Sequence, residues 1–272
     1  MCFFQLGPGG RIRIPTNRDL KAGDRVVGEC VIESGEEVDH FGFSIDGAYS
    51  QMFKARPEWL HKLPDRVSFE TGALVEPFTC GYYAIEANGR TNGSETVVVS
   101  GGGNIGLCAA AAARGMGARV ILIDPLPLRR AAAEKIGVDA TVDPSAGDSV
   151  AKVLKLTGGK GADLVIEASG HDASLAAVFD YVRTGGRVTF VGISIDRKVP
   201  VELGKIQSKS LTIKGTIGSP GVWPAALRFL ARTKLDLSPI QTHFFDLTKG
   251  VEAFEFGKNP SSCIKVTLTN AM

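Results

Sequence analysis

The chain has 272 residues, of which 44% are hydrophobic, and this length suffices for one large domain or two modest ones with ordinary packed cores. Its 31 Lys and Arg residues nearly balance its 29 Asp and Glu residues, and the charges are scattered along the sequence. This balance gives no electrostatic support for a nucleic-acid partner.

No stretch approaches the roughly 18 apolar residues of a membrane span, and the apolar run at residues 1–4 is too short for a signal peptide. We therefore expect no membrane association and a cytoplasmic location. The five cysteines are odd in number, widely spaced and without a Cys-x-x-Cys pair. They indicate neither a disulfide framework nor a cysteine-rich zinc lobe.

The first region, residues 1–77, indicates short strands and turns. A turn at 22–24 precedes the apolar run 25–27, and a turn centred on Gly47 precedes the run 48–53. We therefore expect this region to be rich in β-structure.

From residue 96 onward, apolar strand-like runs alternate with helix-like stretches, which is typical of a parallel sheet covered by helices. The expected strands are 96–100, 119–123, 140–142, 163–167, 187–192 and 211–215. The expected helices are 105–116, 128–136, 149–156 behind a possible Asp148 cap, and 173–182. Six strands fit a complete doubly wound sheet.

The last region begins near residue 219. It contains a helix with Pro224 near its first turn, a second helix at 248–256, and an alternating strand at 264–268 that we expect to return to the N-terminal region. We predict an α/β fold with two domains. The first is a doubly wound six-stranded parallel Rossmann sheet at 78–218, and the second is a partial β-rich domain at 1–77, completed by 219–272.

A glycine-rich turn, Gly101-Gly102-Gly103-Asn104-Ile105-Gly106, joins the first strand of this sheet to its first helix. Glycine turns are common, but this one follows a strand, opens a helix and precedes a strand that ends at Asp124. Gly101 permits the tight turn, Gly103 lets the backbone approach a pyrophosphate, and Gly106 lets the helix pack closely. We expect a dinucleotide whose phosphates face the N–H groups at the helix start, at Asn104 and Ile105.

Asp124 predicts which dinucleotide binds. A carboxylate at the end of the second strand accepts hydrogen bonds from the adenosine ribose, whereas a 2′-phosphate would meet a like charge, so NAD is preferred over NADP. Arg129 and Arg130 favour NADP instead, because a nearby Arg accommodates the 2′-phosphate. Two plainer interpretations stay open: Asp124 as a helix or turn cap, and a Rossmann fold with an empty site.

With these residues placed, the chain resembles the zinc-type medium-chain dehydrogenase/reductase family of alcohol and polyol dehydrogenases, closest to its sorbitol and threonine dehydrogenase branches. The resemblance covers nearly everything from residue 21 onward and rests on the glycine turn and on the segments 21–27, 46–49, 74–77, 161–170 and 185–192. It implies an NAD-binding Rossmann domain and a partial GroES-like catalytic domain, truncated at the N-terminus and lacking the structural-zinc lobe.

The resemblance also implies the reaction. Members of the family oxidise a secondary alcohol or polyol with NAD, while a zinc ion acts as a Lewis acid on the substrate oxygen. Catalytic zinc takes three protein ligands. In this family they come from an N-terminal Cys, from the His of a Gly-His-Glu motif, and from a carboxylate that corresponds to Glu76. Residues 1–17 contain Cys2 but no His, so the bound zinc is doubtful and the catalytic residues are unknown.

For the rest of the cofactor, the resemblance places Val191, Gly192, Ile193 and Ile217 around the nicotinamide carboxamide. Ser169, at the end of the fourth strand, would lie near the nicotinamide ribose, with Arg129 near Asp124 at the other end.

Three functional hypotheses follow. The first is an NAD-dependent dehydrogenase for a small alcohol or polyol, the second is an NAD-binding but catalytically impaired or truncated relative, and the third is a zinc-free enzyme of the quinone-reductase type. The resemblance also suggests a homodimer or homotetramer joined at the sheet edge near 211–218, where an exposed edge would need covering.

Overall fold

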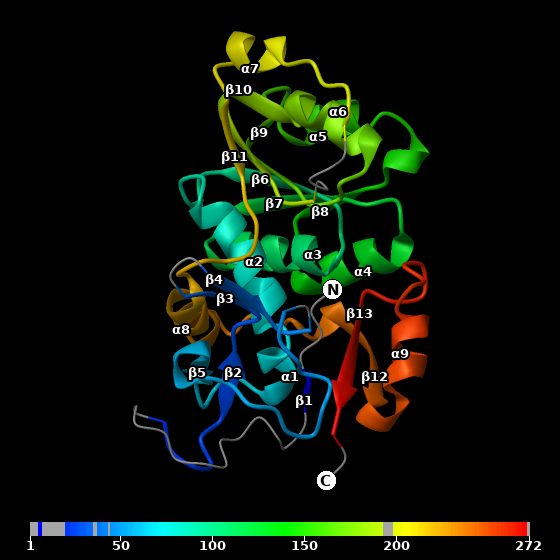
Figure 1. The fold of residues 1–272 in the computed structure, drawn as a ribbon. Coiled ribbons are helices and arrows are strands. Elements are labelled where there is room, and N and C mark those ends of the chain that lie inside the picture. Colours follow the sequence, from blue (N-terminus) through cyan, green and yellow to red (C-terminus); the bar gives the residue numbers. More distant parts are fainter. Residues whose placement is uncertain (1–4, 7–19, 35–36, 43, 193–197, 271–272) are drawn as a thin grey trace. The chain divides into compact units, whose positions relative to one another are not determined.

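The structure is a computed structural model that describes residues 5–6, 20–34, 37–42, 44–192 and 198–270 (Figure 1). The chain divides into two compact units. Unit 1 comprises Met1–Thr79 and Pro220–Met272, and unit 2 comprises Cys80–Ser219. Among the described residues, no helix is both long and apolar enough to cross a membrane.

Unit 2 contains a six-stranded sheet in the order β8-β7-β6-β9-β10-β11, with every neighbouring pair parallel. Its strands are β6 (Thr96–Ser100), β7 (Arg119–Ile123), β8 (Ala140–Val142), β9 (Ala162–Glu167), β10 (Val182–Phe190) and β11 (Thr212–Gly215). The strand order reverses between β6 and β9, so the predicted doubly wound Rossmann sheet is confirmed.

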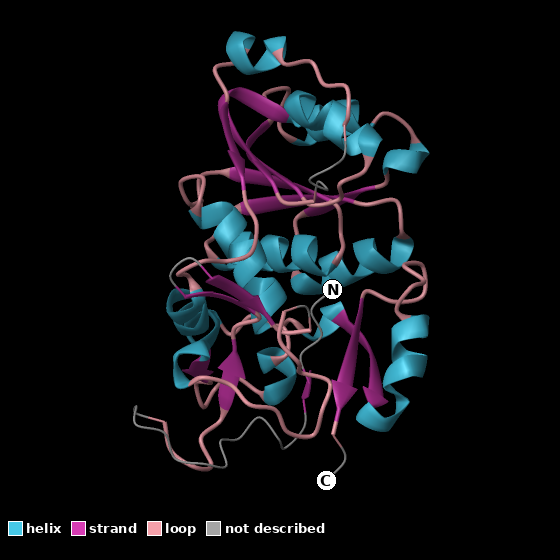
Figure 2. Ribbon diagram, in the orientation of Figure 1, coloured by secondary structure: helices cyan, strands magenta, loops and turns pink. Residues whose placement is uncertain are grey.

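Helices cover both faces of this sheet, with α3 and α4 on one face and α5 and α6 on the other (Figures 1 and 2). They are α3 (Asn104–Gly115), α4 (Pro127–Ile136), α5 (Ser149–Leu156) and α6 (Asp172–Tyr181), with the short α7 (Gly204–Ser208) before β11. Because helices lie on both sides, the central strands are buried on both faces, which explains their continuous apolar runs.

Glycine permits a close contact between helices α2 (Val75–Glu86) and α3. In α2, a Cβ at Gly81 would lie 2.5 Å from the backbone nitrogen of Ala109 in α3. The five consecutive alanines of α3, residues 109–113, are fully buried. Small residues at this contact therefore let the two backbones approach.

Most predicted boundaries in unit 2 agree with the structure to within one or two residues. Asp148 caps α5 as expected, since its carboxylate accepts from the backbone N–H groups of Val150 and Ala151. The prediction was wrong at β10, which begins five residues before Arg187 and ends before Gly192. An irregularity after Val182, with Gly185 at φ +69°, lets the chain join the sheet early.

The described residues of unit 1 form three small sheets. The first has the order β1-β13-β12 with parallel pairs, the second pairs β2 with β5, and the third pairs β3 with β4, both antiparallel. Their strands are β1 (Gln5–Leu6), β2 (Val26–Gly28), β3 (Val31–Ser34), β4 (Glu37–His40), β5 (Leu60–Lys62), β12 (Gln241–Asp246) and β13 (Lys265–Thr269). The last strand thus pairs with the N-terminal one.

The helices of unit 1 are α1 (Phe69–Gly72), α8 (Trp223–Thr233), α9 (Gly250–Phe256) and the first turn of α2. Short 3-10 turns lie at Pro57–Trp59, Ser238–Ile240 and Leu247–Lys249, and one in unit 2 lies at Pro144–Ala146. The expected strand-like run 48–53 is not a strand, because no described segment pairs with it. The predicted helix 248–256 begins instead as a 3-10 turn and continues as α9.

Candidate functional site

The glycine turn lies where β6 ends and α3 begins. Gly101 adopts φ +105°, and its N–H donates to the carbonyl oxygen of Ile123 at 2.8 Å, which ties the turn to the end of β7. Helix α3 starts without a side-chain cap on its N-cap residue Gly103. Its first N–H groups can therefore serve an anionic ligand, except that of Ile105, which donates to Oδ1 of Asn104 at 2.9 Å.

Three of the four glycines of the turn, Gly101, Gly103 and Gly106, meet different surroundings. A Cβ at Gly101 would lie 2.7 Å from the backbone nitrogen of Ser169, and a Cβ at Gly106 would overlap the carbonyl oxygen of Gly101. A Cβ at Gly103 would have nothing within 4 Å. Gly101 and Gly106 are therefore required by close backbone approach, while Gly103 borders open space that a ligand can enter.

Asp124 follows β7 and is only 2% exposed. Its Oδ2 accepts from the N–H of Gly102 at 2.7 Å, and its Oδ1 accepts from the N–H of Leu126 at 2.8 Å. The plainer interpretation, a turn-stabilising carboxylate, is therefore realised in the structure. The same contacts hold this carboxylate directly against the glycine turn.

Both arginines near Asp124 have partners. Nη1 of Arg129 lies 3.3 Å from Oδ2 of Asp124, and Arg130 donates to the carbonyl oxygens of Asp124 and Pro125 while pairing with Asp143 at 3.0 Å. A hydrogen bond from the backbone of Ser145 lowers the pKa of Asp143, and the charge of Arg130 lowers it further. Each guanidinium thus has an acidic partner, and Nε of Arg129 is buried without a hydrogen-bond partner among the described residues.

Glu167, the last residue of β9, is a fully buried carboxylate that the sequence analysis did not single out. It accepts from the N–H groups of Ser169 and Gly170 and from the hydroxyls of Ser169 and Ser174, at 2.5 to 3.3 Å. The available signal was an acidic residue that ends an apolar run and precedes Ser-Gly. Such a buried charge requires this set of donors.

The predicted residues at the end of β10 lie against the same loop. The N–H groups of Val191 and Gly192 both donate to the carbonyl oxygen of Glu167, and a Cβ at Gly192 would lie 2.6 Å from the nitrogen of Gly170. Ile193 lies outside the described residues. Ile217 follows β11 and its side chain is 79% exposed.

The predicted metal ligand Glu76 is half-buried in the first turn of α2, in unit 1. Within the part of the chain that the structure describes, no group of three or more His, Cys, Asp or Glu side chains lies close enough to hold a metal ion. Cys2 lies outside the described residues. The described residues therefore do not fit the three-ligand set of a catalytic zinc.

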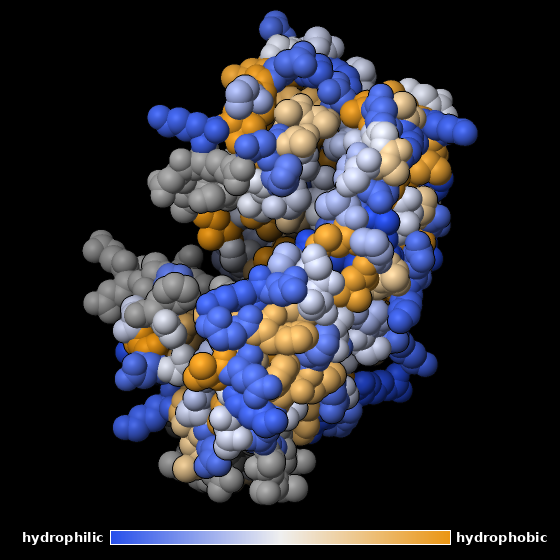
Figure 3. All heavy atoms as spheres, turned by 90° about the vertical axis from the view of Figure 1, so that its right-hand side faces the viewer, coloured by the Kyte–Doolittle hydropathy of each residue, from blue (hydrophilic) through white to orange (hydrophobic). Residues whose placement is uncertain are grey.

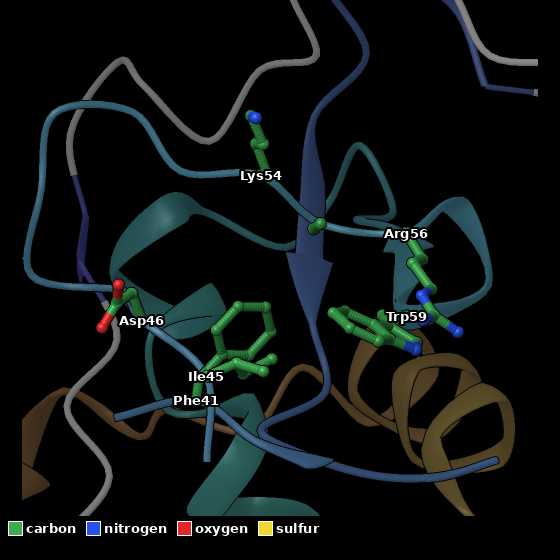
Figure 4. Close-up of a pocket in the computed structure, with 7 residues that line it drawn as sticks. Phe41, Ile45, Asp46, Lys54, Arg56 and Trp59 are labelled. Carbon is green, nitrogen blue, oxygen red and sulfur yellow. The ribbon is translucent and has the colours of Figure 1, made fainter. Parts of the chain in front are cut away.

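Unit 1 has a pocket of about 350 Å³, shown in Figure 4. The rings of Phe41 and Trp59 meet edge to face at 5.4 Å, and Arg56 lies over the Trp59 ring. The lining residues are Phe41, Ile45, Asp46, Lys54, Ala55, Arg56 and Trp59. They include neither Cys nor His, so this pocket offers an aromatic wall with a charged rim rather than a metal centre.

The described surface is mixed in character. Figure 3 shows hydrophilic side chains interspersed with small hydrophobic patches on one face. The exposed large apolar side chains include Phe244 and Val251. This mixture is ordinary for a globular protein.

A family model described as "Zinc-binding dehydrogenase" matches residues 104–232. The sorbitol dehydrogenase of Bacillus subtilis is 31% identical over 82% of this chain, and that of Rattus norvegicus is 32% identical over 90%. The alignments span 63% and 72% of those two proteins, so the chain covers less than two thirds of the Bacillus relative.

Two solved structures show the same fold. The 2R,3R-butanediol dehydrogenase from Bacillus subtilis has a TM-score of 0.84 and 28% identity, covering 92% of this chain and 75% of its own. A putative zinc-binding dehydrogenase from Sinorhizobium meliloti 1021, bound to NADP, has a TM-score of 0.85 and 26% identity, covering 93% and 78%.

Proposed function

Because this chain belongs to the zinc-type medium-chain alcohol and polyol dehydrogenase family, we propose that it is an NAD-dependent oxidoreductase acting on a secondary alcohol of the polyol class. One observation carries the proposal: the glycine turn of unit 2 borders open space at Gly103, beside an uncapped helix start and next to Asp124. Sorbitol and butanediol, in the names of the relatives, both carry hydroxyl groups on neighbouring carbons. A vicinal diol is therefore the substrate class that we propose.

The proposed cofactor position follows from the strand order. Dinucleotides bind across the carboxyl ends of the strands where the order reverses, which is between β6 and β9 here. The pyrophosphate would lie at the start of α3, where the helix dipole contributes about 0.3 to 1 kcal/mol per exposed anionic group. The adenosine half would extend over β7, and the nicotinamide half over β9 and β10, near Ser169, Val191 and Gly192.

We propose NAD rather than NADP. Asp124 would accept hydrogen bonds from the adenosine ribose, and charge-assisted bonds of this kind contribute roughly 1.5 to 3 kcal/mol each. A 2′-phosphate would instead approach this carboxylate, while Arg129 and Arg130 are already paired with Asp124 and Asp143. The NADP in the Sinorhizobium structure makes the comparison of both cofactors a necessary test.

The proposed reaction moves a hydride from the alcohol carbon to the nicotinamide ring and releases the hydroxyl proton, which yields a carbonyl product, NADH and H⁺. In this family a bound zinc supplies Lewis-acid polarisation of the substrate oxygen. Glu76 is the metal ligand that we propose for this chain. Since the described residues do not complete a ligand set around it, hydride transfer has no assigned metal step here.

That incomplete ligand set favours a second candidate function, which is NAD binding without turnover. The cofactor features all lie in unit 2, whereas Glu76 belongs to unit 1. Binding and turnover can therefore be lost separately. A strong preference for NADPH would instead support a zinc-free reductase of the quinone-reductase type.

The test measures zinc content, NAD and NADPH binding by calorimetry, and NADH formation on one purified sample of the full chain. The substrates are vicinal diols, longer polyols and amino alcohols, with zinc supplied. NAD binding with NADH formation supports the dehydrogenase, and binding without turnover supports the second candidate. A sample that binds neither cofactor contradicts both.

We also propose that the chain forms a homodimer or homotetramer through β11. This strand is the edge of the six-stranded sheet, and Thr212, Lys214 and Gly215 are exposed. An edge strand presents unpaired N–H and C=O groups that a second copy can pair with. Light scattering that gives the mass of a single chain would contradict this proposal.

A further inference from the structure

Glu167 joins three segments of unit 2. Its Oε1 accepts from Ser169 Oγ at 2.5 Å and from Ser174 Oγ at 2.9 Å, and its Oε2 accepts from the N–H of Gly170 at 3.1 Å. Ser174 belongs to α6, and its hydroxyl also lies 2.6 Å from that of Ser100, the last residue of β6. The carboxylate therefore links the ends of β6 and β9 with the loop that follows β9.

The loop after β9 packs against two segments that border the candidate cofactor site, the glycine turn and the end of β10. A Cβ at Gly101 would lie 2.7 Å from the nitrogen of Ser169, and a Cβ at Gly192 would lie 2.6 Å from the nitrogen of Gly170. The loop thus touches the glycine turn on one side and the end of β10 on the other. The glycine turn is also held from the β7 side by Ile123 and Asp124, so a shift of the loop would move chiefly the β10 border of the site.

Packing alone does not require an acid at this position. A carboxylate buried without partners is strongly unfavourable, and an apolar side chain would extend the buried run Leu164–Ile166 at no such cost. The structure instead supplies four donor groups, of which two are backbone N–H groups of the loop. The hydrogen bonds of Glu167 therefore fix the backbone conformation of the loop after β9.

We propose that Glu167 is a positioning residue for the nicotinamide half of the dinucleotide. It lies at the carboxyl end of β9, in the half of the sheet formed by β9, β10 and β11, on the opposite side of the switch point from Asp124. It is fully buried and acts on the ligand only through Ser169 and Gly170. The proposal rests on the proposed NAD binding.

The same strand offers a matched control at its other end. Oδ2 of Asp163 accepts from the N–H of Thr96 at 2.7 Å, and its Oδ1 pairs with Arg183 at 2.6 Å. Asp163 is thus another strand-organising carboxylate of β9, but it lies at the amino edge of the sheet. Loss of its charge should lower stability without changing the affinity for NAD relative to ADP.

The experiment compares NAD with ADP, which contains the adenosine and pyrophosphate groups but no nicotinamide riboside. In Glu167→Gln, an NH₂ group takes the place of Oε2, so the N–H of Gly170 loses its 3.1 Å contact and keeps only the 3.3 Å contact to the other oxygen, while the side-chain size is kept. If the loop then occupies its binding geometry about a tenth of the time, NAD affinity falls about tenfold, because apparent affinity scales with the competent population. ADP affinity should change less, because ADP lacks the nicotinamide riboside that would lie over β9 and β10.

Calorimetry on the full-length wild type, Glu167→Gln, Ser174→Ala and Asp163→Asn gives the ratio of the two affinities for each protein. Ser174→Ala removes only one hydroxyl, so it provides a milder variant if Glu167→Gln does not fold, and it should change the ratio in the same direction. Asp163→Asn should leave the ratio unchanged.

Equal loss of NAD and ADP affinity, or an unchanged ratio in both Glu167→Gln and Ser174→Ala, overturns the proposal while leaving NAD binding intact. A change of the ratio in Asp163→Asn as large as in Glu167→Gln overturns it too. Failure of the wild type to bind either ligand refutes the proposed function, and with it this proposal. Failure of the Glu167 proposal can therefore be distinguished from failure of the proposed NAD binding.

Discussion

Replacing Asp124 by Asn removes the buried charge beside the glycine turn and leaves the side-chain size unchanged. Its two carboxylate oxygens accept from the N–H groups of Gly102 and Leu126 at 2.7 and 2.8 Å. An amide offers only one acceptor oxygen, so one of these N–H groups must face an NH₂ group. A buried N–H left without a partner costs about 1 to 3 kcal/mol, and Arg129 also loses its ion-pair partner.

The expected effect on the cofactor is comparable in size with the effect on folding. Loss of one charge-assisted bond to the ribose weakens NAD binding by roughly ten- to a hundredfold. Affinity for NADP should fall less or rise, because the like charge is gone and the guanidinium of Arg129 becomes available. We therefore expect the NAD to NADP affinity ratio to decrease by at least about tenfold, measured by calorimetry.

Asp139 provides a matched control for this substitution. Its Oδ2 accepts from the N–H of Val120 in β7 at 2.8 Å and pairs with Arg114 at 3.2 Å. Asp139→Asn removes a similar set of contacts at the amino end of the same strand. The assignment of Asp124 to cofactor selection would be refuted by an unchanged NAD to NADP ratio in Asp124→Asn, or by an equal change in Asp139→Asn.

Three further substitutions test other parts of unit 2. In Gly106→Ala, the added Cβ overlaps the carbonyl oxygen of Gly101, so we expect NAD binding to be lost and stability to fall, and tight NAD binding by this variant would contradict the turn geometry. Asp148→Ala removes the cap of α5 and should lower the free energy of unfolding by about 1 kcal/mol in urea titrations, with NAD affinity unchanged. Burial raises the pKa of Tyr181, whose hydroxyl lies 2.8 Å from that of Ser149. Since the folded pKa exceeds the unfolded value of about 10, this contribution is complete below that pH and is lost as pH rises through the folded pKa. Tyr181→Phe should therefore lose less stability than the wild type on going to strongly alkaline pH, and equal losses would contradict this assignment.

The sheet could be predicted from the sequence because its strands carry their own local signals. Central parallel strands are buried on both faces and read as continuous apolar runs, as in Val97, Val98 and Val99. The early start of β10 could not be predicted in this way, since residues 182–186 resemble a helix end followed by a glycine turn. Pairing with β9, which begins at Val182, makes this segment part of strand β10.

Unit 1 was harder to predict. Its strands are short, and a strand requires a partner strand that the local pattern does not identify, as the run 48–53, which joins no described sheet, demonstrates. Helix α1 went unpredicted because four residues carry too little periodicity. Its local signals were the N-cap Ser68, which accepts from the N–H of Thr71, and the acidic Glu70 in the first turn.

The residues of the candidate site also differ in how far the sequence alone could identify their roles. Gly101 and Gly106 could be assigned from spacing, because their roles depend on a turn and a helix that are contiguous in the chain. Glu167 could not, because its contacts depend on how the loop after β9 folds back and on Ser174, whose hydroxyl pairs with that of Ser100 in β6. A buried carboxylate becomes informative only once its partners are known.

Asp124 and Glu167 occupy equivalent places on opposite sides of the switch point. Each follows or ends a strand adjacent to β6, each is almost fully buried, and each accepts from backbone N–H groups of a loop that borders the glycine turn. Since both carboxylates are held by the chain itself, the borders of the cofactor site are set before a ligand arrives, and little ordering has to accompany binding. Cofactor affinity should therefore depend on these two contacts in unit 2, independently of whether a metal completes a site around Glu76.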